Sequence, residues 1–307
     1  MLKITKNIDE ANLITHASKF HADEVFATAL LSKIYPNSTI CRVNEVPSNI
    51  SDEKIVYDIG FGIYDHHMKD FDLRHDSGVK YASFGLIFKE FGIKYLETID
   101  KENALAAYTM IEHDLVEGVD AVDNGEFPIV TAPYNYKGIE SLINDYNACW
   151  DDDTDNDLYF LQVVDIISSY FDRVVLHTLA KIKAKKYVDE AIINSSDYIM
   201  ILDKYMPFKD IVITSELEQA KDILFAITPS NRGGYNIHTI PRDKSTHETR
   251  MDFPKEWGGL VDKELQKVSG VETAVFCHKE LFLAVASTKE DALKMAKIAI
   301  LNGEIDK

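Results

Sequence analysis

Short apolar runs alternate with helical stretches in the N-terminal part of the chain, and this alternation restricts the fold more than any other feature. Runs typical of buried strands occupy residues 12–16, 39–43 and 54–60. Between the first two lies "ADEVFATALLSKIY", where apolar residues recur at helical spacing and Asp23 and Glu24 suit the first turn of a helix. A further helix is expected in "SFGLIFKEFGI". Strands that alternate with helices predict parallel β-α units and an α/β fold.

The sequence changes character after a long helical run. Residues 158–192 contain no glycine or proline and carry apolar residues at helical spacing, which predicts one long amphipathic helix. The acidic segment before it, residues 147–157, is expected to be a solvated loop or a helix start. Short β-like runs separated by turns then predict a second, α+β domain, and these runs are residues 198–203, 210–214, 222–229, 235–241 and 273–287. A C-terminal helix is expected to end just before Gly303.

Charge and cysteine content restrict the classes of function. Lys and Arg number 33 and Asp and Glu number 51, so the formal net charge is 33 − 51 = −18. A chain this acidic is not a general nucleic-acid binder, so a polyanionic substrate needs a local basic patch or metal ions that offset the carboxylates. The three cysteines form no CxxC pair, which argues against a zinc ribbon and suits a reducing compartment. Without an apolar run of signal-peptide or membrane-spanning length, we expect a soluble cytoplasmic protein.

Four polar clusters in the N-terminal part carry the candidate chemistry. They comprise His16, His21 and Asp23; Asp58; Asp65, His66 and His67; and Asp120, Asp123 and Asn124. Each cluster alone has a structural explanation, such as a charge in the first turn of a helix or the chemistry of a tight turn. Together they fall near the ends of strands in one predicted parallel sheet, where side chains from several strands converge on one site.

Carboxylates and imidazoles that face one site need a positive partner, because like charges repel and a desolvated carboxylate is costly. A pair of divalent cations meets this need, and mixed imidazole and carboxylate ligands suit Mn²⁺, Zn²⁺, Co²⁺ or Fe²⁺. Two such ions about 3.5–4 Å apart activate water and hold a phosphoryl group during its displacement. One carboxylate, for which Asp58 is the candidate, would bridge them.

Asp65-His66-His67 matches the motif that names the DHH phosphoesterase superfamily. More closely, the chain resembles the melanocyte-proliferating-gene family in "THASKFHADEVFATALL", "VYDIGFGIYDHH", "KYASFGLIF", "VDAVDNG" and a C-terminal stretch from "DFPKEWGGL" to "CHKELF". The resemblance covers nearly the whole chain. It implies a metal-dependent hydrolase, and most closely a 3′–5′ exonuclease that acts on RNA or short oligonucleotides.

The resemblance also implies an architecture and a cofactor. We expect a DHH-like catalytic domain with a parallel sheet and helices on both faces (residues 1–156), a long connecting helix (157–196) and a smaller α+β substrate-binding domain (197–307). Two divalent ions would lie in the first domain, with Mn²⁺ as the first choice and Zn²⁺, Co²⁺ and Mg²⁺ as alternatives.

Individual roles follow from the same resemblance. The implied ligands are His16 and His21 for the first ion, Asp58 for both ions, and Asp23, His66 and Asp123 for the second. His67 is expected to face the substrate phosphate, and Asp65 to orient a neighbouring histidine. The wider superfamily commonly has aspartate at the position of His21, so the choice between Mn²⁺ and Zn²⁺ stays open. The choice between Asp120 and Asp123 also stays open.

The C-terminal domain holds the candidates for substrate binding. They are Arg232, His238, Arg242, Arg250 and His278. Arginine binds phosphate in a bidentate manner, which suits a clamp on an anionic substrate. "PRDKSTHETR" (residues 241–250) collects positive charge in an acidic chain, although a solvated loop accounts for the same letters.

Three other functions fit parts of the pattern. A phosphatase, nucleotidase or pyrophosphatase of the same superfamily would cleave small phosphates and leave oligonucleotides intact, and the negative net charge favours short substrates. A metal-stabilised binding protein without turnover would need fewer ligands than this chain offers. A protein-cleaving metalloenzyme would need the H-E-x-x-H arrangement, which the chain lacks. The preference for RNA or DNA and the oligomeric state, a homo-oligomer included, are left open.

Overall fold

A four-stranded parallel sheet forms the centre of the N-terminal part of the protein in the computed structural model, which describes residues 2–128, 131–244, 246 and 248–303. Its strands, in spatial order, are β1 (Lys3–Thr5), β3 (Thr39–Val43), β2 (Leu13–His16) and β4 (Ile55–Val56). Leu13 of β2 pairs with Ile40 on one side and Ile55 on the other. The α/β class with a parallel sheet is therefore confirmed. Strand β4 is shorter than expected because the chain turns at Asp58, whose φ is 56°.

Helices α1 (Ala22–Ile34) and α2 (Ser83–Asp100) pack against each other beside this sheet. Residues 22–31 of α1 are all buried, and the rings of Phe26 and Phe84 lie 5.0 Å apart between the two helices. Burial of each such side chain stabilises the fold by about 1.5–3 kcal/mol. Pro36, which cannot continue a helix, follows the end of α1. The helix that carries part of the candidate site is therefore held rigidly from its first turn.

Shorter helices complete the N-terminal part. They are α3 (Ala104–Ile111), a π-helical turn (Glu112–Val116), α4 (Glu117–Asp123) and α5 (Ile139–Asp145), with a 3-10 turn near the N-terminus (Ile8–Glu10). One face of the sheet, around Ile14 and Cys41, is covered by Ile8 of that 3-10 turn and Ile50 of a loop. These elements leave the ends of β2 and β4 next to the start of α1 and the end of α4, which is where the candidate site forms.

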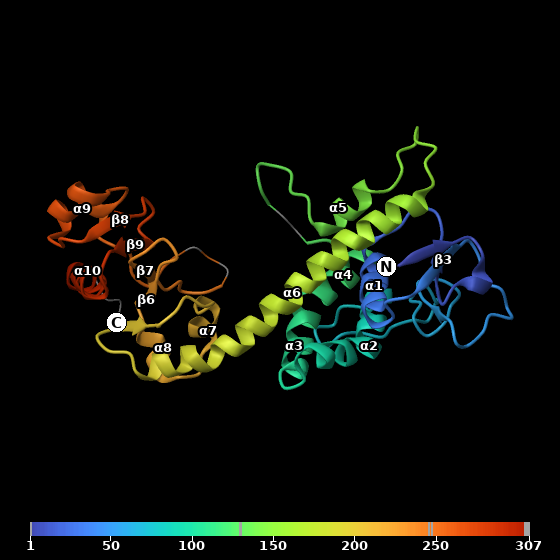
Figure 1. Cartoon of the computed structure of the whole chain (residues 1–307), viewed down its shortest axis with the longest axis horizontal. Coiled ribbons are helices and arrows are strands. Elements are labelled where there is room, and N and C mark those ends of the chain that lie inside the picture. The colour runs from blue at the N-terminus through green and yellow to red at the C-terminus, as the bar shows by residue number, and fades with distance from the viewer. Residues whose placement is uncertain (1, 129–130, 245, 247, 304–307) are drawn as a thin grey trace. The chain divides into compact units, whose positions relative to one another are not determined.

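The long helix α6 (Asn156–Ile193) runs as one continuous helix (Figure 1), and its residues contribute to two cores. The chain divides into two units, Met1–Leu179 and Ala180–Lys307, so the division falls within this helix. Phe160 and Phe171 are buried in the first unit, where the Phe160 ring contacts Phe20 and the Phe171 ring contacts Phe84. Val188 belongs to a core of the second unit. The expected boundaries at residues 156 and 196 stay a prediction. In the structure, the N-terminal part of α6 packs in the first unit and its C-terminal part packs in the second.

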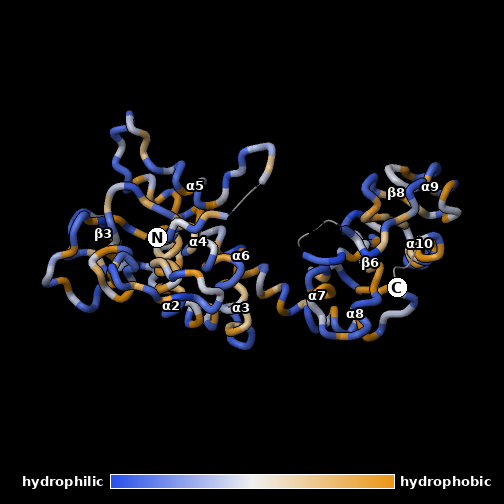
Figure 2. Tube along the Cα trace, turned by 180° about the vertical axis from the view of Figure 1, so that it is seen from behind, coloured by the Kyte–Doolittle hydropathy of each residue, from blue (hydrophilic) through white to orange (hydrophobic). Residues whose placement is uncertain are grey.

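The second unit is built on a five-stranded mixed sheet. Its strands, in spatial order, are β5 (Ile199–Ile201), β6 (Phe225–Pro229), β7 (Tyr235–Thr239), β9 (Leu283–Ala286) and β8 (Ala274–Cys277). Its helices are α7 (Lys209–Thr214), α8 (Glu218–Asp222), a 3-10 turn (Lys255–Trp257), α9 (Asp262–Ser269) and α10 (Lys289–Asn302). Figure 2 shows hydrophobic residues along β6 and α10, and Phe225, Trp257 and Met295 are buried in the same core.

One expected strand is wrong: residues 210–214, "DIVIT", lie within helix α7. Its adjacent residues Ile211 and Val212 are both buried, which a strand with one solvated face does not achieve. They pack in the same core as Val188 of α6. Tertiary packing therefore overrides the β propensity of this short apolar run. Among the described residues, no helix is long and apolar enough to cross a membrane.

Candidate metal centre

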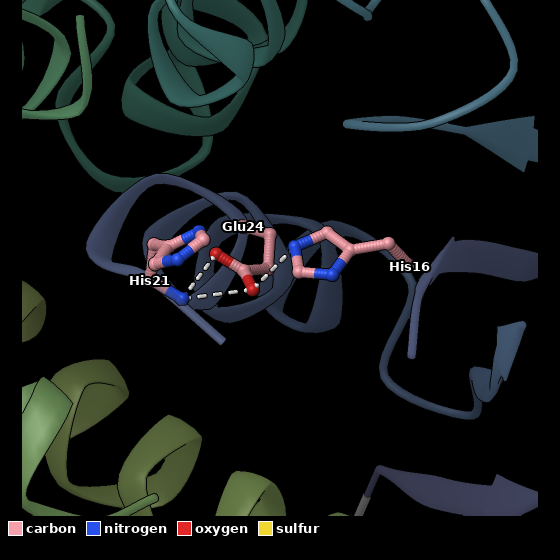
Figure 3. Close-up of side chains that lie close together, drawn as sticks. All are labelled: His16, His21 and Glu24. Carbon is pink, nitrogen blue, oxygen red and sulfur yellow. Dashed lines mark hydrogen bonds and ion pairs between the residues drawn. The ribbon is translucent and has the colours of Figure 1, made fainter. Parts of the chain in front are cut away.

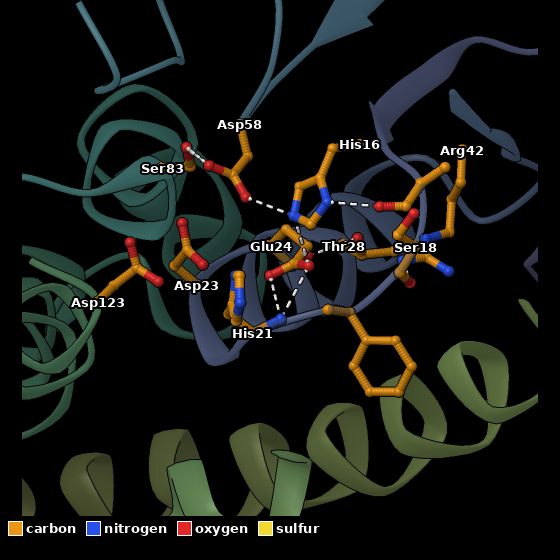
Figure 4. Close-up of polar contacts among 12 residues, drawn as sticks. His16, Ser18, His21, Asp23, Glu24, Thr28, Arg42, Asp58, Ser83 and Asp123 are labelled. Carbon is orange, nitrogen blue, oxygen red and sulfur yellow. Dashed lines mark hydrogen bonds and ion pairs between the residues drawn. The ribbon is translucent and has the colours of Figure 1, made fainter. Parts of the chain in front are cut away.

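Histidines and carboxylates from four segments converge at one edge of the parallel sheet (Figure 4). The end of β2 contributes His16, and the start of α1 contributes His21, Asp23 and Glu24. The loops that follow β4 contribute Asp58, His66 and His67, and the end of α4 contributes Asp123. The convergence follows from topology, because the carboxyl ends of parallel strands share one edge and α1 begins there. Part of the site lines a cavity of about 570 Å³.

His16 presents one ring nitrogen to two carboxylates. Its Nδ1 lies 2.9 Å from the Ala17 carbonyl oxygen, which only accepts, so Nδ1 carries a proton. Its Nε2 lies 2.9 Å from Glu24 Oε1 and 3.1 Å from Asp58 Oδ2. Burial alone would lower the pKa of His16, but interactions with Asp58 and Glu24 outweigh it and raise the pKa to about 11. Such an Nε2, with Nδ1 fixed by a carbonyl, is the arrangement found in metal-binding histidines.

Glu24 is a residue of this site that the sequence patterns did not single out. Its side chain is fully buried between His16 and His21 (Figure 3), and its two carboxylate oxygens accept from the His21 backbone N–H at 2.9 and 2.8 Å. This reciprocal cap is available because Glu24 occupies the third helical position after His21. That spacing was the available signal, but it indicates a helix cap as readily as a metal site.

A second group of side chains surrounds His66. Its Nε2 lies 3.1 Å from Asp123 Oδ2, 3.5 Å from Asp58 Oδ1 and 3.9 Å from Asp23 Oδ2. Burial alone would lower the pKa of His66, but interactions with Asp123 and Asp58 raise it to about 10. A histidine among three carboxylates therefore forms the second half of the site.

Asp23 shows most directly that the site suits a cation. Its carboxylate is fully buried, and both oxygens lack a hydrogen-bond donor among the described residues. Burial and the nearby carboxylates Asp58 and Asp123 raise the pKa of Asp23 well above its ordinary value. A buried carboxylate without donors costs several kcal/mol in real proteins unless a proton or a cation neutralises it. Because ligand atoms of Asp23, His21 and Asp123 lie within 4.8 Å of one another, these residues fit a metal ion.

Asp58 is placed between the two histidines. Its Oδ2 faces His16, whereas its Oδ1 faces His66 and accepts from Ser83 Oγ at 3.1 Å. Burial tends to raise the pKa of Asp58, but His16 and His66 hold it below its usual range. The backbone of Asp58 is left-handed, a conformation that aspartate tolerates better than most residues. Each oxygen is thus directed at a different half of the site.

The two adjacent histidines of the Asp65-His66-His67 motif have different surroundings. The side chain of His66 is 7% exposed, whereas that of His67 is 56% exposed and lines the cavity. Asp65 is buried, accepts from Phe61 N–H at 2.7 Å and contacts His67 Nδ1 at 2.7 Å. This hydrogen bond to Asp65 raises the pKa of His67. Asp65 therefore orients His67, and not His66.

Asp120 lies outside the cluster. Its Oδ2 is 2.8 Å from His75 Nε2, and its Oδ1 accepts from Gly85 N–H at 3.0 Å. A Cβ at position 85 would approach Asp120 to 1.8 Å, so this contact requires glycine. The geometry favours Asp123 over Asp120 as a ligand, and it gives Asp120 a structural partner, His75, that the sequence patterns did not indicate.

Comparison with known proteins identifies the family. The MYG1 exonuclease family model, described as "Uncharacterised protein family (UPF0160)", matches residues 12–300. The chain belongs to this family. A MYG1 protein of Dictyostelium discoideum is 30% identical over 94% of this chain and 96% of its own length. The MYG1 exonucleases of Mus musculus and Homo sapiens are 29% and 28% identical, over 93% of this chain and 84% and 85% of their own lengths.

Membership in the MYG1 exonuclease family confirms the resemblance inferred from the motifs, and exonucleases are hydrolases. No solved structure gives a significant match. The ligand assignments that the resemblance implies can therefore be compared only with the geometry of this chain.

In this member of the MYG1 exonuclease family, the basic residues of the second unit that are candidates for substrate binding differ in their exposure and in their hydrogen bonds. Arg232 is exposed and lines a cavity of about 830 Å³. Next to it, Gly234 has a φ of 72°, and a Cβ there would lie 2.5 Å from the Ala286 carbonyl oxygen. The glycine thus lets this loop, which carries Arg232, lie against β9.

The remaining candidates are more strongly tied to the fold. Arg250 Nη1 donates to the carbonyl oxygens of Ala220, Lys221 and Ile223 at 2.5, 3.2 and 2.9 Å. Burial and then Lys209 lower the pKa of His238 to about 4, so His238 is neutral near pH 7. Arg242 Nε donates to the Thr249 carbonyl, and His278 Nδ1 accepts from the Glu280 backbone. His247, which belongs to the basic stretch, lies outside the described residues.

Proposed function

We propose that the chain is a metal-dependent phosphoesterase that acts as a 3′–5′ exonuclease on RNA or short oligonucleotides. The observation that carries the proposal is the buried carboxylate of Asp23, whose two oxygens have no hydrogen-bond donor among the described residues. It lies in a cluster with the carboxylates of Asp58 and Asp123 and the imidazoles of His21 and His66. Mouse and human relatives that are named exonucleases support the choice of reaction. The net charge of −18 supports cations as the means of holding an anionic substrate.

Two divalent cations, with Mn²⁺ as the proposed species, would be held by this set. His16 and His21, together with Asp58, would hold the first, and Asp23, His66 and Asp123, again with Asp58, the second. The opposite directions of the two Asp58 oxygens support its role as the bridging ligand. When bound, such ions lower the pKa of water and stabilise negative charge on phosphoryl oxygens.

The chain's own residues then bind and orient the phosphate. His67 is exposed toward the cavity, and its Nδ1 is held by Asp65. That hydrogen bond raises the pKa of His67. When His67 is protonated, its Nε2–H can donate to a phosphate oxygen. Asp65 and Phe61 N–H fix the orientation before substrate arrives. In the second unit, Arg232 is the candidate best suited to contact an anionic part of the substrate.

Hydrolysis assays with and without metal test this proposal. Protein treated with EDTA and then titrated with Mn²⁺ should gain activity on bis-nitrophenyl phosphate and on a short RNA labelled at its 5′ end, with products that shorten from the 3′ end. Absence of hydrolysis of both substrates at every Mn²⁺ concentration would refute the phosphoesterase proposal. Products that shorten from the 5′ end would refute only the polarity.

A phosphatase or pyrophosphatase acting on small molecules is the second candidate, and the strongly acidic composition favours it over an enzyme for long nucleic acids. A length series from mononucleotide to a ten-residue RNA separates the two. An exonuclease cleaves the longer strands, whereas the phosphatase releases phosphate from the mononucleotide and leaves the strands intact.

A further inference from the structure

A second cavity in the first unit, of about 820 Å³, has aromatic walls. It is formed by helix α5, the segments on either side of it and the start of α6, and the rings of Tyr136, Tyr146 and Tyr159 line it. Tyr136 is 69% exposed, so its ring is available to a ligand. The amide side chains of Asn147 and Gln162 add hydrogen-bonding groups. Aromatic faces combined with a few amides suit a flat heterocycle.

The charges around this cavity disfavour an anion. Asp145 and Asp152 are carboxylates in its wall, and Asp145 pairs with Lys137 at 2.5 Å. Asp152 accepts from Tyr159 Oη at 2.7 Å and from Thr154 N–H at 2.9 Å. A phosphate group would meet two carboxylates here and one lysine that is already paired, so electrostatics directs phosphate elsewhere. A neutral ring meets no such penalty.

Hydrogen bonds connect the wall of the aromatic cavity to the loop that precedes His21 of the metal centre. Asn147 lines the cavity, accepts from Phe20 N–H at 2.9 Å and donates to the Phe20 carbonyl at 2.8 Å. Phe20 directly precedes His21, and consecutive Cα atoms lie about 3.8 Å apart. Asn156 further donates to the Ser18 carbonyl at 2.7 Å. The short loop between His16 and His21 is thus held by the same segment that forms the cavity wall.

We propose that this cavity binds an unpaired nucleobase of the substrate strand while a phosphate of that strand lies at the metal centre. The inference rests on the proposed exonuclease function and adds the substrate class, which is a single strand. A base within a duplex is stacked and paired, so its face is not free to stack on tyrosine. The carboxylates of the cavity disfavour a phosphate there, whereas cations bound at the metal centre would attract one, so the base and the phosphate of one strand would bind at different places.

Tyr136→Ala tests the proposal, with Tyr136→Phe as the matched control that keeps the ring. The substrates are a short single-stranded RNA and the same strand with abasic residues at the two terminal positions of each end. Wild type and Tyr136→Phe should prefer the base-bearing strand in kcat/KM by about tenfold, a factor within the range of one stacking contact. In Tyr136→Ala this ratio should fall toward one. Fluorescence anisotropy in EDTA should show the same loss of preference in equilibrium binding.

The outcomes separate this inference from the proposed function. If wild type hydrolyses both strands equally well, or if Tyr136→Ala lowers kcat/KM for both by the same factor, the base site is refuted and the exonuclease stands. If wild type hydrolyses neither strand, the exonuclease proposal fails. The binding measurement in EDTA then still decides whether the cavity distinguishes a base from an abasic residue, and equal binding of both strands refutes the site.

Discussion

The two units of the chain differ in how their candidate site residues are bonded to the rest of the fold. In the first unit, histidines and carboxylates from four separate segments come together, and no residue in the described part of the chain donates a hydrogen bond to the Asp23 carboxylate. In the second unit, the basic residues have dissimilar surroundings, and Arg250 is hydrogen-bonded to three backbone carbonyls. Without a ligand, the buried carboxylates of the first unit destabilise the fold. The hydrogen bonds of Arg250 stabilise the fold and need no ligand. Unsatisfied buried charge is therefore the better guide to function here.

Asp58→Asn should have the largest effect, because it removes the carboxylate that faces both halves of the site. Asparagine tolerates the left-handed backbone at this position, so the fold should persist. Loss of a residue that only hydrogen-bonds to a metal ligand typically lowers activity by roughly 10–100-fold. We expect Asp58→Asn to lower the rate by more than this. Kinetics on bis-nitrophenyl phosphate and Mn²⁺ binding by calorimetry measure this. The exposed Asp70, changed to Asn, is the control of equal charge, and equal rates for the two variants would contradict the assignment.

His66→Ala and His67→Ala should separate binding from rate. His66 is enclosed by Asp23, Asp58 and Asp123, so its loss should lower metal occupancy. His67 is exposed and held by Asp65, so its loss should leave occupancy intact and reduce kcat by about 10²-fold, as loss of a charge-stabilising donor does. Metal analysis of dialysed protein, paired with kcat, gives both quantities. Equal loss of metal in the two variants would show that the adjacent histidines share one role.

The sequence predicted several elements of the first unit correctly because they are defined by local pattern. Strand β3 matches the expected residues 39–43, and α1 begins at Ala22 directly after His21, as the apolar spacing and the acidic first turn indicated. Since strand ends of a parallel sheet share an edge, convergence of the site followed from the order of elements. Whether the converging residues hold two ions stays a prediction.

Other features depend on contacts that are distant in sequence. The run "DIVIT" is equally compatible with a strand or a buried helical turn, and packing against α6 decides for the helix. Arg250 binds carbonyls some 30 positions earlier, which no motif around it indicates. The acidic segment 147–157 was expected to be a solvated loop or a helix start, and α6 does begin at Asn156. No local pattern, however, indicates that Asn147 accepts from Phe20 N–H, 127 positions away. Local periodicity carries no information about such long-range hydrogen bonds.

Glu24→Gln should have an intermediate effect on metal binding, and it tests whether Glu24 supports His16 in the first half of the site. Glutamine keeps an oxygen that accepts from His21 N–H, so the helix cap survives, but it removes a charge 2.9 Å from His16 Nε2. We expect Mn²⁺ affinity to fall by about tenfold, within the range seen for outer partners of metal ligands. Calorimetry measures affinity, and the thermal midpoint of the metal-free protein serves as the control for folding. Unchanged affinity would limit Glu24 to a capping role.

Arg250→Ala and Arg232→Ala should show the smallest effects on catalysis and should differ in kind. Loss of Arg250 leaves three carbonyls without their donor, so we expect destabilisation of about 1–3 kcal/mol, measured by urea unfolding, with KM unchanged. Loss of the exposed Arg232 should leave stability unchanged and raise KM for an oligonucleotide by roughly fivefold at most, since an exposed ion pair contributes about 1 kcal/mol or less. The Arg232 effect should shrink as salt is added. A rise in KM seen only in Arg250→Ala would contradict this prediction. It would mean that Arg250, which is bound to the backbone, contacts the substrate, and that Arg232, which lines the cavity, does not.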